Sequence, residues 1–219
     1  LAGGASRPLT TRPGHYRNPR WSPDGSRIVF SRTGGNILLG TAHGTDPGIY
    51  IVPAAGGEPT LVRTDGTDAR FDHTGTRIYV QTGGGLSKEY RSTRLDGGDE
   101  RTHFTMRYAT NVTPSPDGRW VAFNELFHPY VVPLPAAGSA IELTKDTRAL
   151  LVVCFFFFFF TDLHWSDGGR RLHWMLGPEA YSRPVRDMSA FVEGARAELP
   201  APDTAGIAVG LAVESDVPA

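Results

Sequence analysis

Histidine is the residue in this sequence whose chemistry is easiest to look for, because it ligates metals and acts as a general base near neutral pH. No two of the seven histidines are separated by a single residue, and neither a His-Glu-x-x-His nor a Cys-x-x-Cys motif occurs. Local spacing therefore predicts no metal site. His164 and His173 flank a predicted turn and could approach each other across a hairpin. The seven are His15, His43, His73, His103, His128, His164 and His173.

Residues for nucleophilic or phosphate chemistry do not occur in a productive pattern. The sequence has no Gly-x-Ser-x-Gly elbow, which argues against a serine hydrolase domain within this stretch. The glycine run at residues 83–85 is not followed by Lys-Ser or Lys-Thr, so it does not read as a phosphate-binding loop. We predict no catalytic, cofactor-binding or metal-binding residue in this chain.

Three aspartates, Asp24, Asp117 and Asp167, instead belong to a repeated sequence. Its four copies are residues 21–30 (WSPDGSRIVF), 71–80 (FDHTGTRIYV), 114–123 (PSPDGRWVAF) and 165–174 (WSDGGRRLHW). Proline, aspartate and glycine in this order favour a tight turn in which the aspartate caps backbone amides. We therefore expect these carboxylates to bind their own turns rather than a substrate.

The spacing of the repeats predicts the architecture. The turn glycines Gly25, Gly75, Gly118 and Gly169 are 50, 43 and 51 residues apart, and a period in this range is typical of propellers. Each copy leads into short segments of alternating polar and apolar residues separated by turns, the pattern of antiparallel strands. The predicted fold is an all-β β-propeller of four-stranded antiparallel blades, partial or a fragment, with about four to five blades in this chain.

The strands of each blade can be placed from this pattern. Strands are expected at 27–31, 48–52 and 59–63 in the first repeat, at 77–81, 89–95 and 100–104 in the second, at 120–124, 130–134 and 140–144 in the third, and at 171–176 and 181–186 in the fourth. Residues 1–10 match the hairpin at 54–61. The sequence is therefore expected to start in the middle of a blade: either this segment closes the ring against a distant blade or, as we favour, the natural protein begins earlier.

Burial between stacked blades is the expected role of the large aromatic residues. The positions that we assign to the structural repeat are Trp21, Asp24, Gly25, Gly75, Asp117, Gly118, Trp165 and Gly169. We expect Trp21, Phe30, Tyr50, Phe123, Trp165 and Trp174 to be mostly buried. On that expectation, Trp21→Ala costs about 3–5 kcal/mol, as truncation of a large core aromatic does.

Charge and cysteine content limit the classes of partner. A net charge of −1 and a pI near 6.7 give no basic face for nucleic acid or an anionic membrane. The single cysteine, Cys154, excludes an internal disulfide. The sequence shows neither a signal peptide nor a membrane span, and its Arg-rich, Lys-poor composition suggests a bacterial source. Bacterial cytoplasm and periplasm both stay open as its location.

Six consecutive phenylalanines, residues 155–160, follow Cys154 where a polar loop is expected. Six residues are too short to span a bilayer, and exposed they would promote aggregation. An error in the sequence and a buried strand between blades are the two readings that we keep.

The repeats resemble those of TolB-like propellers, whose blades carry the same Trp-Ser-Pro-Asp-Gly turn followed by an Arg-Ile-Val-Phe strand. Residues 162–179, together with 191–202 and 206–218, are similar to the last blade and the connector of propellers fused to bacterial amidohydrolases. This resemblance implies blades at 1–190 and a connector at 191–219 that leads to a metal-dependent hydrolase domain. A zinc-type ion would belong to that domain, and no cofactor to this chain.

On that resemblance the chain is a non-catalytic module that gates substrate access or mediates assembly. Its partners would be its own downstream catalytic domain or other subunits. One alternative is a free-standing TolB-like propeller that binds a peptide or protein at one face. The other is the propeller of a serine peptidase, which requires a nucleophile elbow downstream.

Overall fold

The computed structural model describes residues 7–35, 44–126, 128–135, 139–147, 153–154, 161–176 and 179–185. Within these ranges the chain consists of β-strands and one short 3₁₀ helix, which confirms the predicted all-β fold. It forms two compact units, Leu1–Arg107 with Ala137–Glu142 and Tyr108–Ala136 with Leu143–Ala219. We call them the first and second units. Residues 1–6, the phenylalanine run and the predicted connector at 191–219 lie outside the described residues.

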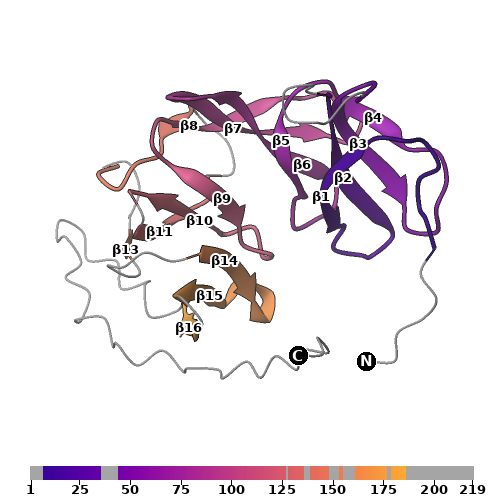
Figure 1. The fold of residues 1–219 in the computed structure, drawn as a ribbon. Helices are drawn as coiled ribbons and strands as arrows, with labels where there is room; N and C mark the ends of the chain where they lie inside the picture. Colours follow the sequence, from indigo (N-terminus) through magenta and orange to yellow (C-terminus); the bar gives the residue numbers. More distant parts are fainter. Residues whose placement is uncertain are drawn as a thin grey trace, which may run out of the picture. The chain divides into compact units, whose positions relative to one another are not determined.

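The first blade is a four-stranded antiparallel sheet in chain order (Figure 1). Strand β2 carries Ile28 and Phe30 on one face and Val29 on the other, and its five central residues are all buried because both faces are covered. The strands are β1 (His15–Trp21), β2 (Arg27–Thr33), β3 (Gly48–Pro53) and β4 (Thr60–Arg63).

The second blade has the predicted meander and one strand more. Its first four strands pair antiparallel in chain order, and the fifth, β12 (Ile141–Glu142), pairs parallel to β8 at the edge of the sheet (Figure 1). The meander consists of β5 (Thr67–Phe71), β6 (Arg77–Gly84), β7 (Ser87–Arg94) and β8 (Arg101–Met106).

The third and fourth blades form the second unit. The third sheet has the order β13-β11-β10-β9, and the fourth has three described strands in chain order. The third consists of β9 (Thr110–Pro114), β10 (Trp120–Glu125), β11 (His128–Pro133) and β13 (Val153–Cys154). The fourth consists of β14 (Thr161–Ser166), β15 (Arg171–Leu176) and β16 (Glu179–Pro184), with η2 (Asp167–Gly169) in its first turn.

The predicted fourth strand of the third blade, residues 140–144, is wrong. Ile141 pairs with Phe104 of the second blade, and Val153 takes the expected place beside Val131. An alternating apolar segment can join any open strand edge, because the backbone groups of an edge pair with whichever strand arrives. Periodicity alone therefore could not choose the sheet.

Apolar side chains between neighbouring blades make the core of each unit. In the first unit, Val29, Ile49 and Ile51 of the first blade pack with Ala69, Phe71, Ile78 and Val80 of the second. In the second unit, Ala122 and Val131 of the third blade pack with Leu172, Trp174 and Val185 of the fourth. Face-to-face packing of this kind buries both faces of a blade and explains why its central strands read as nearly continuous apolar runs.

The expected burial of the aromatic residues holds for four of the six and fails for one. Phe30, Tyr50, Phe123 and Trp174 are buried, and Trp165 is partly buried against the core of the second unit. Trp21 is 63% exposed, so the predicted burial is wrong. On the same face of the first blade, Leu9 and Tyr16 are the partly buried side chains that pack against the cluster of Ile28, Phe30, Tyr50 and Val52.

The described residues contain no helix of the length and apolar character that crossing a membrane requires.

Candidate functional site

Asp24 occupies the first predicted turn and binds it. Its Oδ1 accepts hydrogen bonds from the Ser22 hydroxyl (2.5 Å) and the Ser26 amide (3.1 Å), and its Oδ2 accepts one from the Ser26 hydroxyl (2.7 Å). These donors hold the pKa of Asp24 well below its usual value, with the Ser22 hydroxyl contributing most. This is the turn-capping role expected from the sequence.

The other two repeat aspartates differ from each other. Asp117 reproduces the first turn, with bonds from the Ser115 hydroxyl (2.5 Å) and the Arg119 amide (3.1 Å). Asp167 does not, and its expected capping role is wrong: its carboxylate accepts from the Arg170 guanidinium at 2.6 Å. Asp167 stands one position earlier in its turn than Asp24 and Asp117 do in theirs, and it bonds to a side chain of that turn instead of a backbone amide.

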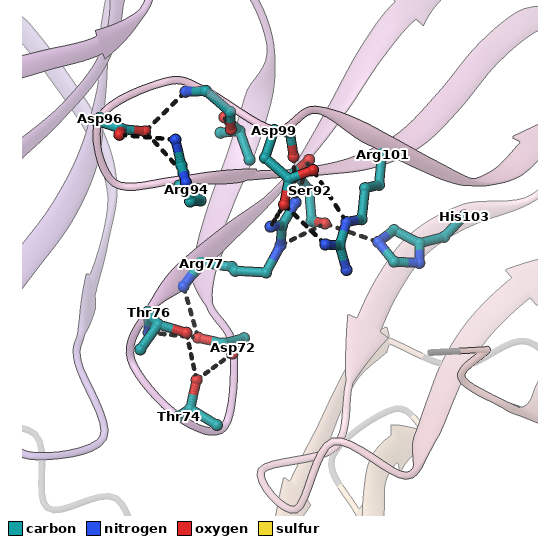
Figure 2. Close-up of polar contacts among 12 residues, drawn as sticks. Asp72, Thr74, Thr76, Arg77, Ser92, Arg94, Asp96, Asp99, Arg101 and His103 are labelled. Atoms are coloured by element: carbon teal, nitrogen blue, oxygen red, sulfur yellow. Dashed lines mark hydrogen bonds and ion pairs between the residues drawn. The ribbon is translucent and has the colours of Figure 1, made fainter. Parts of the chain in front are cut away.

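The second blade keeps the same turn, but the hydroxyl and the carboxylate exchange places relative to Ser22 and Asp24 of the first. Here the acid is at the first turn position, where Asp72 accepts from the amides of Thr76 (2.8 Å) and Arg77 (2.9 Å). The Thr74 hydroxyl donates to Asp72 Oδ2 at 2.5 Å, as Figure 2 shows. The exchange explains why residues 71–80 read as the most degraded copy while the turn is intact.

The turn glycines adopt backbone angles that other residues avoid. Gly25, Gly75 and Gly118 have φ of 70°, 70° and 71°, in the left-handed region where a Cβ is unfavourable. At Gly169, φ is 92° and an added Cβ would lie 2.8 Å from the Asp117 carboxylate. Glycine is thus required there by the approach of the neighbouring blade as well as by φ.

The densest polar cluster lies across three strands of the second blade (Figure 2). We call Arg77, Ser92, Asp99, Arg101 and His103 the Arg77 cluster. Arg77 donates from Nε to the Ser92 hydroxyl (3.1 Å) and from Nη1 to the Asp99 carboxylate (2.6 Å). Asp99 also accepts from Arg101 Nη2 (2.8 Å), and the two guanidinium groups lower its pKa, Arg101 more than Arg77.

Ser92 and His103 form a hydroxyl–imidazole pair of the kind that a nucleophile and its base make. The Ser92 hydroxyl and His103 Nε2 are 2.8 Å apart, within the distance that such a pair needs. However, Ser92 is completely buried, and Asp99, the acid of the cluster, binds the two arginines. Ser92 also accepts a bond from Arg77 Nε, and the tautomer of His103 decides which of the two groups donates in the Ser92–His103 bond. The arrangement joins β6, β7 and β8 and gives a substrate no access to the hydroxyl.

Aromatic rings surround the same histidine. Tyr79 lies edge-on to His103 with ring centroids 5.3 Å apart, and it stacks on Tyr90 at 5.4 Å. Burial raises the pKa of Tyr79. Edge-on and stacked rings add packing energy to the buried polar contacts on this face of the blade.

His164 and His173 do approach each other, as the sequence suggested. They are directly paired across β14 and β15, and their rings stack at 5.0 Å. His173 Nε2 and the Ser166 hydroxyl are hydrogen-bonded. Burial, followed by His164 and Arg171, lowers the pKa of His173. Within the described parts of the chain, no group of three or more His, Cys, Asp or Glu side chains is placed to hold a metal ion.

The structure also shows a buried arginine that the sequence analysis did not single out. Arg32 is 5% exposed, on the same face of β2 as Ile28 and Phe30. Its guanidinium lies over the rings of Tyr16 (5.6 Å) and Tyr50 (5.4 Å). The sequence pattern that could have revealed it is the alternation in β2, which places Arg32 on the same face as two apolar residues.

The arrangement of the blades can be compared with solved structures. No family model and no curated protein sequence matches this chain. TolB from Acinetobacter baumannii is similar at 18% identity and a TM-score of 0.50, over 80% of this chain and 41% of that one. The acylaminoacyl peptidase of Pyrococcus horikoshii is similar at 10% identity and a TM-score of 0.50, over 78% of this chain and 31% of the peptidase. The chain has a TolB-like β-propeller fold.

The β-propeller domain of the trilobed protease from Pyrococcus furiosus is similar over 77% of this chain. This chain covers 54% of that domain, at 10% identity and a TM-score of 0.49. The chain thus spans between about a third and about half the length of these three structures. At identities this low the likeness extends to the fold, and function has to be argued from the residues.

Proposed function

We propose that this chain is the non-catalytic propeller module of a larger protein, a metal-dependent amidohydrolase, in which it gates substrate access or mediates assembly. The main support for the non-catalytic role is that the polar groups of the Arg77 cluster bond to one another. Its hydroxyl, imidazole and carboxylate all bond to groups of their own blade. Side chains that could do chemistry hold strands together here, as the turn carboxylates of Asp24 and Asp117 do.

The amidohydrolase assignment is supported by the resemblance of residues 162–179. In the structure this segment contains β15 and all but the first residue of β14, paired in register from His164 with His173 to Ser166 with Arg171. A hairpin at this position is what a propeller blade requires, and the link to a further domain rests on the resemblance. The proposal places the hydrolytic metal in that further domain and not among the histidines described here.

The proposal is tested on the protein in its native source. An antibody raised against this 23.8 kDa chain should detect a polypeptide of at least twice that mass. Mass spectrometry of that band should find peptides with a His-x-His motif beyond residue 219. A native band at the mass of this chain alone would refute the fused amidohydrolase. A Gly-x-Ser-x-Gly motif in the additional peptides would favour a serine peptidase instead.

A free-standing peptide-binding propeller is the second candidate, and Trp21 favours it. Strand β1 exposes Trp21 next to Arg20, with Arg17 also exposed, and aromatic and arginine side chains are enriched at protein interfaces. On this alternative the native band has the mass of a single propeller, and Trp21→Ala weakens binding of an identified partner at least tenfold in calorimetry. Unchanged affinity would remove Trp21 as the contact.

A further inference from the structure

Strand pairing in the fourth blade brings two histidines together that are distant in the sequence. His164 of β14 and His173 of β15 are direct partners across the antiparallel pair. Their rings are nearly parallel, at 12°, with centroids 5.0 Å apart. Residues that face each other in this way have Cβ atoms about 4.5–5.5 Å apart. Two imidazoles at this separation can bind the same ion.

The histidine pair lies on the face of the fourth blade that is turned away from the core of the second unit. Trp165, Leu172 and Trp174 alternate with the two histidines along β14 and β15 and pack in that core, and successive side chains of a strand point to opposite faces. His164 is exposed and His173 is partly buried. An ion in solution can therefore reach the imidazoles.

The repeat itself does not require histidine at this pair of positions. His164 and His173 stand five residues before and four residues after the turn glycine Gly169. The equivalent pairs of the first three blades are Arg20–Val29, Arg70–Tyr79 and Thr113–Ala122. The sheet therefore forms equally well without an imidazole at either place.

Ser166 orients one of the two rings, because its hydroxyl and His173 Nε2 are hydrogen-bonded. In the tautomer with the proton on Nε2, this nitrogen donates to the Ser166 oxygen, and Nδ1 carries the lone pair that a metal binds. Histidines that bind metals commonly give their second ring N–H to an oxygen of the protein, which holds the ring and makes it a better ligand. Ser166 stands where such a partner is expected.

Imidazole nitrogen determines the class of ion. It suits zinc and copper, whereas magnesium and calcium prefer oxygen ligands. A tetrahedral zinc ion with Zn–N bonds of about 2.0 Å needs its two nitrogens about 3.3 Å apart. Rings with centroids 5.0 Å apart reach this separation when their edges turn toward each other about χ2, which is a soft torsion in histidine.

We propose that His164 and His173 form a two-histidine binding site for a divalent transition metal ion, zinc or copper, on the exposed face of the fourth blade. Within the part of the chain that the structure describes, no group of three or more ligating side chains is in place, so water completes the coordination. Arg171, the strand partner of Ser166, brings a positive charge to the same face, and the ion is therefore held reversibly. The site goes beyond the proposed function, and the module role stands or falls without it.

Calorimetric titration of the whole chain near neutral pH tests the site. The parent should bind zinc, and copper more tightly, in the order that nitrogen sites follow, and excess magnesium should not compete. His164→Asn removes one ligand and should weaken zinc binding at least tenfold. His73→Asn, which replaces an exposed histidine in the turn of the second blade, is the matched control and should leave the affinity unchanged.

Electron paramagnetic resonance with one equivalent of copper counts the ligands. The parent should show two imidazole nitrogens, and His164→Asn and His173→Asn should each show one; far-ultraviolet circular dichroism confirms that both variants fold. Ser166→Ala should weaken binding about tenfold while both nitrogens remain, which separates positioning from ligation. A parent that binds zinc no more tightly than the histidine variants, a copper spectrum with one nitrogen, or equal competition by magnesium would overturn the proposal, and the two rings would then only stack.

Discussion

Two aromatic residues of the first unit, Phe104 and Trp21, differ in how much of the side chain is buried, and this difference predicts how much stability each contributes. Phe104 is completely buried, beside Tyr90 at 6.5 Å between ring centroids, whereas Trp21 is 63% exposed. We expect Phe104→Ala to lower the free energy of unfolding by about 3–5 kcal/mol, the usual cost of removing a buried aromatic ring. This is a large fraction of the roughly 5–15 kcal/mol that stabilises a domain.

Trp21→Ala should cost much less. With about a third of the side chain covered, it removes on the order of 80 Å² of buried apolar area, which corresponds to roughly 2 kcal/mol as an upper limit. The value of 3–5 kcal/mol expected from the repeat alone is therefore replaced by this lower one. Tryptophan emission near that of the free amino acid in water would confirm the exposure in a variant whose other three tryptophans are replaced.

Urea denaturation followed by far-ultraviolet circular dichroism measures both changes on the same transition, since both residues lie in the first unit. For a slope near 2 kcal/mol per molar urea, the midpoint should fall by about 1.5–2.5 M for Phe104→Ala and by less than 1 M for Trp21→Ala. Equal shifts would refute the assigned packing. So would a Phe104→Ala midpoint indistinguishable from that of the parent.

Three further predictions concern the turns and the histidine pair. Gly25→Ala should lower stability by about 1 kcal/mol in thermal unfolding, because φ is 70° while nothing lies within 4 Å of the added methyl group; no loss would mean that the turn relaxes freely. Asp24 should titrate below 3.8 in a carboxyl NMR experiment, so its stabilising effect is present above the unfolded pKa and is lost only as the pH falls through the lower folded value. His173 has a folded pKa below 6.5, so the unfolded chain takes up the proton first and stability falls as the pH drops below about 6.5; a His173→Gln variant that keeps the same pH slope would contradict this.

The turn chemistry explains how much of the fold could be predicted from the sequence. A Ser-Pro-Asp-Gly turn depends on bonds among five or six consecutive residues, so its geometry is contained in the local sequence. The strands on either side follow from alternation, which is also local. The edge that β12 joins is not local, because Ile141 pairs with Phe104 and no pattern within residues 140–144 favours that partner over another.

The polar sites needed information of a different kind. Arg77, Ser92 and His103 come together because three strands are in register, and each looks ordinary by itself in the sequence. Arg32 could have been noticed as a charge in phase with Ile28 and Phe30. That no described carboxylate forms an ion pair with it could not, since the partners of a buried charge depend on all of its surroundings.

Trp21, Phe71 and Trp165 show why repeat position alone does not set the environment of a residue. Each pairs with the same position of the following strand, with Ile28, Ile78 and Leu172 respectively. Phe71 is buried against the first blade, and Trp165 donates from its ring nitrogen to the Thr113 carbonyl of the third at 2.9 Å. The aromatic side chain therefore gains its burial from the neighbouring blade and not from its own sheet. At Trp21 the described residues place no second blade and the position is 63% exposed, so burial has to be predicted from pairs of repeats rather than from one.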